Sequence, residues 1–288
     1  MRWKTGRRSS NLDDRRRRGG IRAGRGRKAA GGGIGLIVLA LVAMFFGIDP
    51  RMVMQIGGAL DGGGTQISTQ PVEDQSELVD FVRVVLADTE DTWKNIFAQG
   101  NQRYREPTLV LFSGSTQSAC GHAQSAMGPF YCPGDQQIYI DLAFYQELRT
   151  KFGAPGDFAQ AYVIAHEVGH HVQTLMGISD LVRKTQARSS QAEGNAIQVK
   201  MELQADCFSG VWANHASRYR NMLEEGDIEE GLRAAAAIGD DTIQKRTRGY
   251  VVPESFTHGT AAQRQQWFSI GLKTGDIRQC DTFSANTG

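Results

Sequence analysis

Apolar residues recur at three- and four-residue spacing along most of the chain beyond residue 72. Over Glu73–Gln99 this spacing predicts an amphipathic helix. The same pattern predicts five further helices, over Leu142–Phe152, Asp157–Met176, Ser190–Arg220, Ile228–Ile238 and Thr260–Lys273. Two short β-prone runs, Thr108–Phe112 and Gln136–Asp141, are bounded by Gly, Pro and Ser and predict strands. The expected fold is a helix-rich α+β domain with a small antiparallel sheet.

A different pattern occupies Ala29–Ile48, where 20 consecutive residues carry no charge. As a helix they would span roughly 30 Å, enough to cross the hydrocarbon core of a bilayer. No small-x-small cleavage site follows Ile48, so an uncleaved anchor is expected and not a signal peptide. Gln55–Val72 is rich in Gly, Ser, Thr and Gln, as flexible linkers are. The predicted organisation is a basic arm (1–28), a transmembrane helix (29–48), a linker (49–72) and one domain (73–288).

Charge is distributed unevenly along the chain. Met1–Lys28 holds 12 of the 32 Lys and Arg residues and only two acidic residues, so its formal charge is +10 while the whole chain carries +1. A basic arm of this kind could bind nucleic acid. The uncharged segment that follows favours a different interpretation, in which the arm is a membrane topology signal that contacts lipid headgroups. By the positive-inside rule the arm is expected in the cytoplasm and the domain on the other side of the membrane, with no nucleic-acid partner.

Four cysteines, all beyond the predicted anchor, fit an oxidising compartment and permit two disulfides. Of the three possible pairings we expect Cys120–Cys132, a local loop closure, and Cys207–Cys280, a tie from a long helix to the C-terminus. The alternative is a structural zinc site with His122 between Cys120 and Cys132. That spacing contains no CxxC pair, and a fourth ligand is not evident.

The run Ala161-Tyr-Val-Ile-Ala-His-Glu-Val-Gly-His-His171 contains the pattern H-E-x-x-H. On a helix His166 and His170 lie on one face, so both imidazoles reach one metal ion. Glu167 is turned by about 100° from His166, beside the metal, where its carboxylate can take a proton from a bound water. His171 points away from this pair and is expected to be structural or on the surface.

Hydrolytic zinc is usually held by three protein ligands, with the fourth position open to water. The best candidate for the third ligand is Glu202, inside a long predicted helix. Asp206, one turn later on the same face, is expected to accept the distal N–H of a histidine ligand and fix its tautomer. The small residues Ala205 and Ser209 on that face would let this helix approach the Gly169 side of the first helix closely.

Three segments together resemble the bacterial family of putative neutral zinc metallopeptidases: His166–Gln173, Glu202–Gly210 and Phe256–Arg264. The resemblance covers most of Val72–Phe283 and implies a zincin-like domain with one zinc ion per chain. Members are typically single-pass membrane proteins, which implies the bacterial inner membrane with the domain periplasmic or extracellular. In wider groups with this Glu-Leu-x-Ala-Asp pattern, a downstream His or Arg stabilises the transition state, which points to His258 or Arg264. Alternatively these two residues are a helix-entry His and a surface Arg.

The pattern as a whole predicts a metallopeptidase that hydrolyses peptide bonds with zinc-activated water, Glu167 as general base and His258 as oxyanion donor. If Gln136–Asp141 is an edge strand beside the cleft, a peptide or protein substrate binds extended along it. The alternative is a non-catalytic, membrane-tethered zinc domain that binds a peptide or partner protein, since zinc binding alone does not require Glu167. Zinc hydrolases of amides or esters share the same ligands. The sequence indicates neither the preferred substrate nor the oligomeric state.

Overall fold

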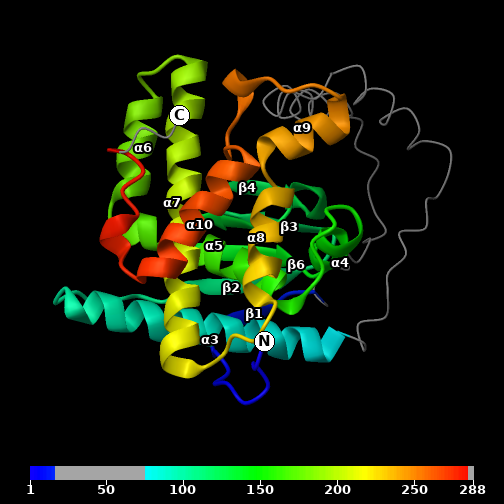
Figure 1. The fold of residues 1–288 in the computed structure, drawn as a ribbon, viewed down its shortest axis with the longest axis vertical. Helices are drawn as coiled ribbons and strands as arrows, with labels where there is room; N and C mark the ends of the chain where they lie inside the picture. Colours follow the sequence, from blue (N-terminus) through cyan, green and yellow to red (C-terminus); the bar gives the residue numbers. More distant parts are fainter. Residues whose placement is uncertain (17–74, 285–288) are drawn as a thin grey trace, which may run out of the picture. The chain divides into compact units, whose positions relative to one another are not determined.

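The computed structural model describes residues 1–16 and 75–284, and helices account for more than half of these residues (Figure 1). The helices are α3 (Ser76–Gln99), α4 (Ala143–Thr150), α5 (Asp157–Leu175), α6 (Ile178–Gln186), α7 (Gln191–Arg220), α8 (Asp227–Ala237), α9 (Asp240–Arg248) and α10 (Ala261–Thr274). The strands are β1 (Leu12–Asp14), β2 (Thr108–Phe112), β3 (Ser115–Ser118), β4 (Gly121–Gln124), β5 (Phe130–Cys132) and β6 (Gln137–Asp141). The helix-rich α+β class expected from the sequence is confirmed.

The main sheet has the strand order β1-β2-β6-β5 and is mixed. β1, β2 and β6 are parallel, and only β5 runs antiparallel to its neighbour β6. The prediction of an antiparallel sheet was therefore wrong for three of its four strands. The connection from β2 to β6 contains the separate β3–β4 hairpin and β5, and it is long enough for the crossover that parallel strands require. β6 lies inside the sheet and β5 forms its edge, so the expected edge strand at Gln136–Asp141 is also corrected.

The first sixteen residues are part of this folded unit. β1 pairs with β2 through Leu12 and Leu109, and Trp3 packs edge to face on Phe81 of α3. Arginines of the segment bind acidic side chains of α3: Arg7 contacts Glu90 and Asp91, and Arg8 contacts Asp80. This part of the predicted basic arm is thus not a separate segment, because Trp3 and Leu12 are buried and its charge is paired within the fold.

The remainder of the predicted arm, the predicted anchor (29–48) and nearly all of the linker lie outside the described residues. Within residues 1–16 and 75–284, no helix has both the length and the apolar character needed to cross a membrane. The transmembrane helix therefore stays a prediction.

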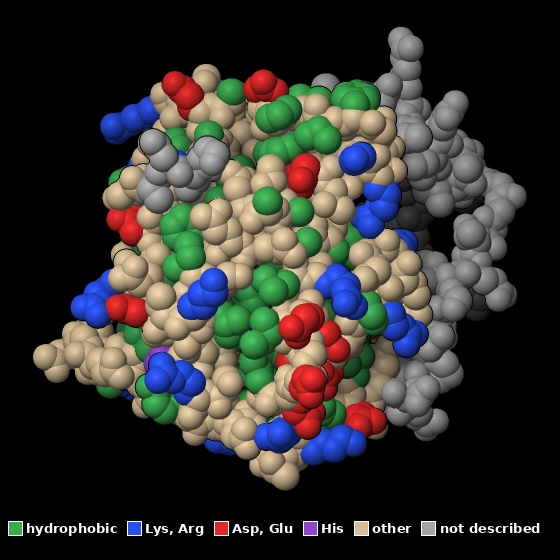
Figure 2. Space-filling view, in the orientation of Figure 1, with side chains coloured by type: hydrophobic (Ala, Val, Ile, Leu, Met, Phe, Trp, Pro, Cys, Tyr) green, Lys and Arg blue, Asp and Glu red, His purple; other side chains and the backbone are tan. Residues whose placement is uncertain are grey.

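The N-terminal ammonium of Met1 lies in an acidic pocket at the start of α5. Its nitrogen is 3.1 Å from carboxylate oxygens of Asp157 and Glu224 and 3.4 Å from Asp227. Figure 2 shows acidic side chains gathered on this face of the molecule. Burial lowers the pKa of the ammonium, but the surrounding carboxylates outweigh burial and raise it. The pocket binds a cation that the chain itself supplies, and it ties the N-terminus to the first residue of α5.

Close backbone contacts bring α5, α7 and α10 together. A Cβ atom on Gly169 of α5 would lie 3.1 Å from the backbone of Ala205 on α7. A Cβ atom on Gly271 of α10 would lie 1.9 Å from the carbonyl oxygen of Cys207, also on α7. Capping boxes at Ser190 and Thr260 fix where α7 and α10 begin. These glycines are therefore the reason that the three helices approach closely enough to share one site.

Both expected disulfides are present, Cys120–Cys132 and Cys207–Cys280. The first closes the loop between β3 and β5, and the second joins α7 to the C-terminal segment. Because the sulfur atoms of Cys120 and Cys132 are bonded to each other, the alternative structural zinc site with His122 is excluded.

Candidate metal centre

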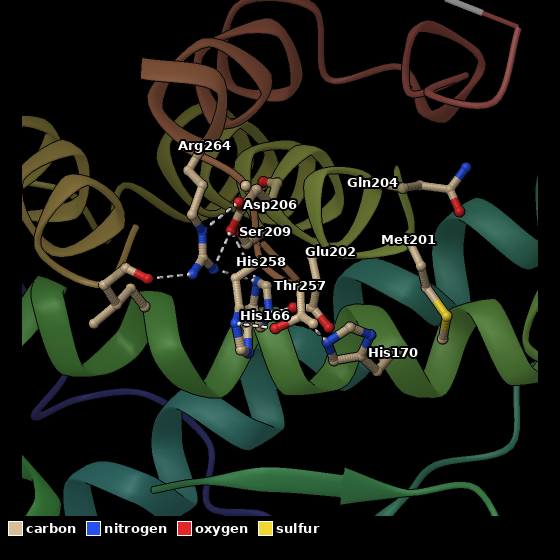
Figure 3. Close-up of polar contacts among 12 residues, drawn as sticks. His166, His170, Met201, Glu202, Gln204, Asp206, Ser209, Thr257, His258 and Arg264 are labelled. Atoms are coloured by element: carbon tan, nitrogen blue, oxygen red, sulfur yellow. Dashed lines mark hydrogen bonds and ion pairs between the residues drawn. The ribbon is translucent and has the colours of Figure 1, made fainter. Parts of the chain in front are cut away.

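Three ligand atoms converge where α5 crosses α7 (Figure 3). Nε2 of His166 lies 3.1 Å from Oε2 of Glu202, and Nε2 of His170 lies 3.4 Å from the same oxygen. The four-residue spacing on α5 brings the two imidazole rings to a centroid separation of 4.8 Å. All three side chains are buried, and their ligand atoms lie within 4.8 Å of one another. The structure thus brings together the three residues that the sequence proposed as metal ligands.

Asp206, one turn along α7 from Glu202, orients His166. Its Oδ1 lies 2.8 Å from Nδ1 of His166, and because a carboxylate only accepts, Nδ1 carries a proton, which leaves Nε2 as the nitrogen that would bind a metal ion. Asp206 also accepts from Tyr162 at 2.5 Å and from Arg264 at 2.8 and 3.0 Å. The charge of Asp206 is therefore balanced inside the protein, and its position is fixed from three sides.

Of the two interpretations of Arg264 from the sequence, the surface arginine is wrong. Only 2% of its surface is exposed, so it is not a surface residue. Its guanidinium binds Asp206 and donates to the carbonyl oxygen of Ile238 at 3.2 Å. Arg264 contacts Asp206, and Asp206 contacts His166, so Arg264 is linked to the metal centre. It points inward because α10 packs against α7.

The electrostatics of the three ligands favour a cation between them. Burial opposes a charge on His166, but Asp206 and Glu202 outweigh burial and raise its pKa to about 10. Burial likewise disfavours the charged form of Glu202, but His170 and His166 hold its pKa well below the ordinary value. Two imidazole nitrogens and one carboxylate oxygen are the donor set of many catalytic zinc sites. The residues present therefore fit a zinc ion.

Glu167 and the ligands border one cavity of about 590 Å³. Burial raises the pKa of Glu167, while His170 and His166 lower it; the net effect is a rise. The cavity walls are mainly apolar. They come from the β5 segment, the α4 region, α5 and α6, and also from α7, α9, α10 and the loop before α10. Their apolar lining residues include Met127, Phe130, Tyr131, Phe144, Phe152, Val163 and Val182. A carboxylate suited to proton transfer thus faces a space large enough for a peptide segment.

His258 also borders this cavity, from the loop before α10. Asp240 at the start of α9 holds that loop, because its Oδ2 accepts backbone N–H groups of Thr257, His258 and Gly259 at 2.6 to 3.0 Å. Its Oδ1 lies 3.2 Å from Nδ1 of His258. Burial lowers the pKa of His258, but Asp240 and Glu202 outweigh burial and raise it. Asp240 therefore holds His258 at the wall of the cavity.

His171 points away from the ligands and is fully buried. Its Nε2 donates to the carbonyl oxygen of Arg105 at 2.6 Å, and its Nδ1 accepts from the hydroxyl of Tyr131 at 3.2 Å. Since Tyr131 belongs to β5, this histidine connects the edge strand to α5.

Several residues that shape the site were not singled out from the sequence: Tyr162, Gln173, Gln198, Gln204 and Asp240. Gln173 lies three residues after His170, a spacing that places two helical side chains in contact and could have indicated it. Asp240 lies 18 residues from His258 in another element, so no local spacing indicates it.

Comparison with known proteins places this chain in a family. The model of the family described as "Putative neutral zinc metallopeptidase" matches residues 1–283. "Uncharacterized protein YpfJ" of Escherichia coli K12 is 50% identical over 287 residues, covering 98% of this chain and 99% of that protein. "Uncharacterized protein Rv2575" of Mycobacterium tuberculosis H37Rv is 49% identical over 192 residues, covering 63% of this chain and 64% of that protein. No solved structure matches the chain at a significant level.

Proposed function

The chain belongs to the putative neutral zinc metallopeptidase family, and we propose that it hydrolyses peptide bonds with one zinc ion held by His166, His170 and Glu202. The observation that carries the proposal is the convergence of these three ligand atoms at a cavity that Glu167 also borders. Zinc binding alone would not require that fourth side chain.

When bound, zinc supplies Lewis acidity that activates water and polarises a carbonyl group. Glu167 accepts the proton of the attacking water and then passes it to the leaving amine. Its buried carboxylate has a raised pKa, which makes it a stronger base and helps the first of these transfers. His258, held by Asp240, donates a hydrogen bond to the carbonyl oxygen as negative charge develops there.

The substrate in this proposal is an extended peptide that pairs with the exposed edge of β5. β5 is the edge strand next to the cavity, and Phe130 and Tyr131 line the cavity wall. Main-chain pairing with an edge strand gives affinity that is independent of sequence, and the apolar walls favour apolar side chains. In this proposal β5 takes the role that was expected for Gln136–Asp141.

We further propose that the folded unit works in an oxidising compartment outside the cytoplasm, attached to the membrane through residues 29–48. The two disulfides support the compartment. The pairing of Arg7 and Arg8 with carboxylates of α3 supports a chain without a nucleic-acid partner.

The test is zinc content by elemental mass spectrometry together with casein cleavage on the same full-length samples. We expect about one zinc ion per chain in the wild type. Glu202→Ala should lose both zinc and cleavage. Glu167→Gln should keep zinc and lose cleavage by about 100-fold or more, since a general base typically contributes that much. Glu193→Gln, an exposed residue of α7, is the matched control and should change neither.

Each result has a separate meaning for the site. Zinc retained by Glu202→Ala would remove Glu202 from the ligand set. Cleavage by Glu167→Gln at the wild-type rate would exclude it as the base. A wild type with zinc and no cleavage of any peptide would favour the non-catalytic zinc domain.

A further inference from the structure

A chain of buried amide hydrogen bonds leads from His170 to the C-terminal segment. Nδ1 of His170 lies 2.8 Å from Oε1 of Gln173. Nε2 of Gln173 donates to Oε1 of Gln204 at 3.0 Å and to the carbonyl oxygen of Met201 at 2.7 Å. Nε2 of Gln204 donates to the carbonyl oxygen of Cys280 at 2.9 Å. We call the two glutamines and these bonds the amide relay; Gln204, Met201 and His170 are labelled in Figure 3.

The direction of every bond in the amide relay is fixed by its two backbone ends. Carbonyl oxygens only accept, so Cys280 requires the NH₂ group of Gln204 and Met201 requires the NH₂ group of Gln173. The amide oxygen of Gln173 must then face His170, whose Nδ1 has to donate. Nε2, on the side of Glu202, is consequently the nitrogen of His170 that would bind a metal ion.

The C-terminal end of the amide relay is held firmly. Cys280 is 1% exposed and bonded to Cys207 of α7, and two residues later the hydroxyl of Thr282 donates to the carbonyl oxygen of Lys200 at 2.6 Å. The segment Ile277–Phe283 therefore lies along the part of α7 that includes Glu202. Removing Cys280 from its place would leave a buried amide of Gln204 without an acceptor, which is costly.

We propose that Gln173 and Gln204 are positioning residues for His170, and that the Cys207–Cys280 disulfide contributes to metal affinity by holding the last acceptor of the amide relay. The inference rests on the proposed metal centre. His166 is oriented by a charged group, Asp206, whereas His170 is oriented only through neutral amides. Outer hydrogen bonds to a ligating histidine typically change metal affinity by about 10- to 100-fold.

The test uses full-length protein, with the zinc dissociation constant measured by chelator competition and the absorption spectrum recorded with Co²⁺ in place of zinc. Gln173→Met and Gln204→Met keep the side-chain length and remove the hydrogen bonds. Gln160→Met is the matched control on α5, because the Oε1 atom of Gln160 is buried without a partner. Cys280→Ala tests the disulfide directly.

Gln173→Met should raise the zinc dissociation constant by about 10- to 100-fold and shift the Co²⁺ spectrum. Gln204→Met should raise it less, and the double variant should match Gln173→Met alone, because both changes interrupt the same relay. Cys280→Ala should weaken zinc binding in the wild type but not in the Gln204→Met background. Gln160→Met should behave as the wild type.

Wild-type zinc affinity and an unchanged spectrum in both Gln173→Met and Gln204→Met would overturn the amide relay while leaving the zinc site intact. Additive losses in the double variant would also overturn it, since independent packing effects add. A wild type that binds no zinc would overturn the proposed function together with this inference. If Cys280→Ala does not fold, the two glutamine variants, which retain the disulfide, still decide the question.

Discussion

Arg264 is a buried cation whose main partner is one carboxylate. Asp206, which is also fully buried, accepts two of its hydrogen bonds, and the pair lies directly behind His166. Removing one member of a buried ion pair leaves the other charge without compensation, which costs more than the intact pair contributes. The stability of the unit and the orientation of His166 thus depend on the same contact.

We expect Arg264→Met to lower the free energy of unfolding by about 3–5 kcal/mol, because it leaves Asp206 buried and unpaired. Urea unfolding of the metal-free protein at pH 7 measures this. Arg278, largely exposed and bonded to Asp276, provides the control, and Arg278→Met should lower the free energy of unfolding far less than Arg264→Met. An equal loss in the free energy of unfolding for the two substitutions would contradict a buried ion pair between Arg264 and Asp206.

A second residue-scale prediction concerns pH. Burial lowers the pKa of His171 to about 4 from an ordinary value of 6.5, so the folded state favours the neutral ring. The contribution of the neutral ring to the free energy of unfolding is fully present above pH 6.5. It falls by about 3 kcal/mol in total as the pH is lowered towards 4. Urea unfolding of the wild type and His171→Gln between pH 7.5 and 4.5 should show their difference shrinking with acid. A difference that is constant with pH would contradict the assignment.

At this scale the sequence indicated the residues whose roles follow from local spacing. His166, Glu167 and His170 form one helical motif, and Glu202 belongs to a second motif. Asp240 and Gln204 escaped notice because their partners come from distant parts of the chain. Ordinary Asp and Gln residues acquire such roles only when the fold brings those partners to them.

Among the elements, helices were easier to predict than strands. The range Thr108–Phe112 was predicted as observed, and α5 and α7 begin and end within one residue of the predicted bounds. Helices α6 and α9 were missed because both are short and strongly polar. The parallel order of the sheet was missed because it depends on pairing between residues far apart, which no local pattern records.

The contact between α7 and α10 allows a prediction about a single methyl group. Gly271→Ala should destabilise the protein by about 1–3 kcal/mol or more, because the new Cβ would overlap the carbonyl oxygen of Cys207. This loss should exceed the roughly 1 kcal/mol that alanine gains over glycine inside a helix. Gly194→Ala in α7 meets almost nothing and should raise the melting temperature slightly. Thermal unfolding that ranks the two variants in the opposite order would contradict the close helix contact.

At the scale of the whole molecule, the pairing of β1 with β2 restricts the predicted membrane topology. A strand pairs only with a neighbour on its own side of a membrane, so Met1–Arg16 and the main unit lie on one side. A single crossing by residues 29–48 with a cytoplasmic N-terminus does not fit a chain folded in this way. The sequence could not reveal this, because β1 is three residues long and surrounded by arginine.

Labelling decides the point, because all four cysteines are in disulfides and an introduced cysteine is the one reactive thiol. Ser10→Cys and Ser76→Cys both occupy exposed positions, one on each side of residues 17–74. We expect a membrane-impermeant maleimide to modify both variants or neither in cells with a permeabilised outer membrane. Modification of only one would indicate a single crossing, and hence that β1 does not pair with β2 in the cell.

The same pairing has a consequence for release of the protein from a membrane. Residues 17–74 join two parts of one folded unit, so a protease that cuts within them separates the covalent chain without removing β1 from the sheet. The product would be a two-chain molecule in which Met1 still occupies its acidic pocket at the start of the metal-binding helix. Because residues 29–48 stay covalently joined to one of the two fragments, a single nick of this kind would leave both the attachment and the site whole, and the short N-terminal fragment would separate only on denaturation.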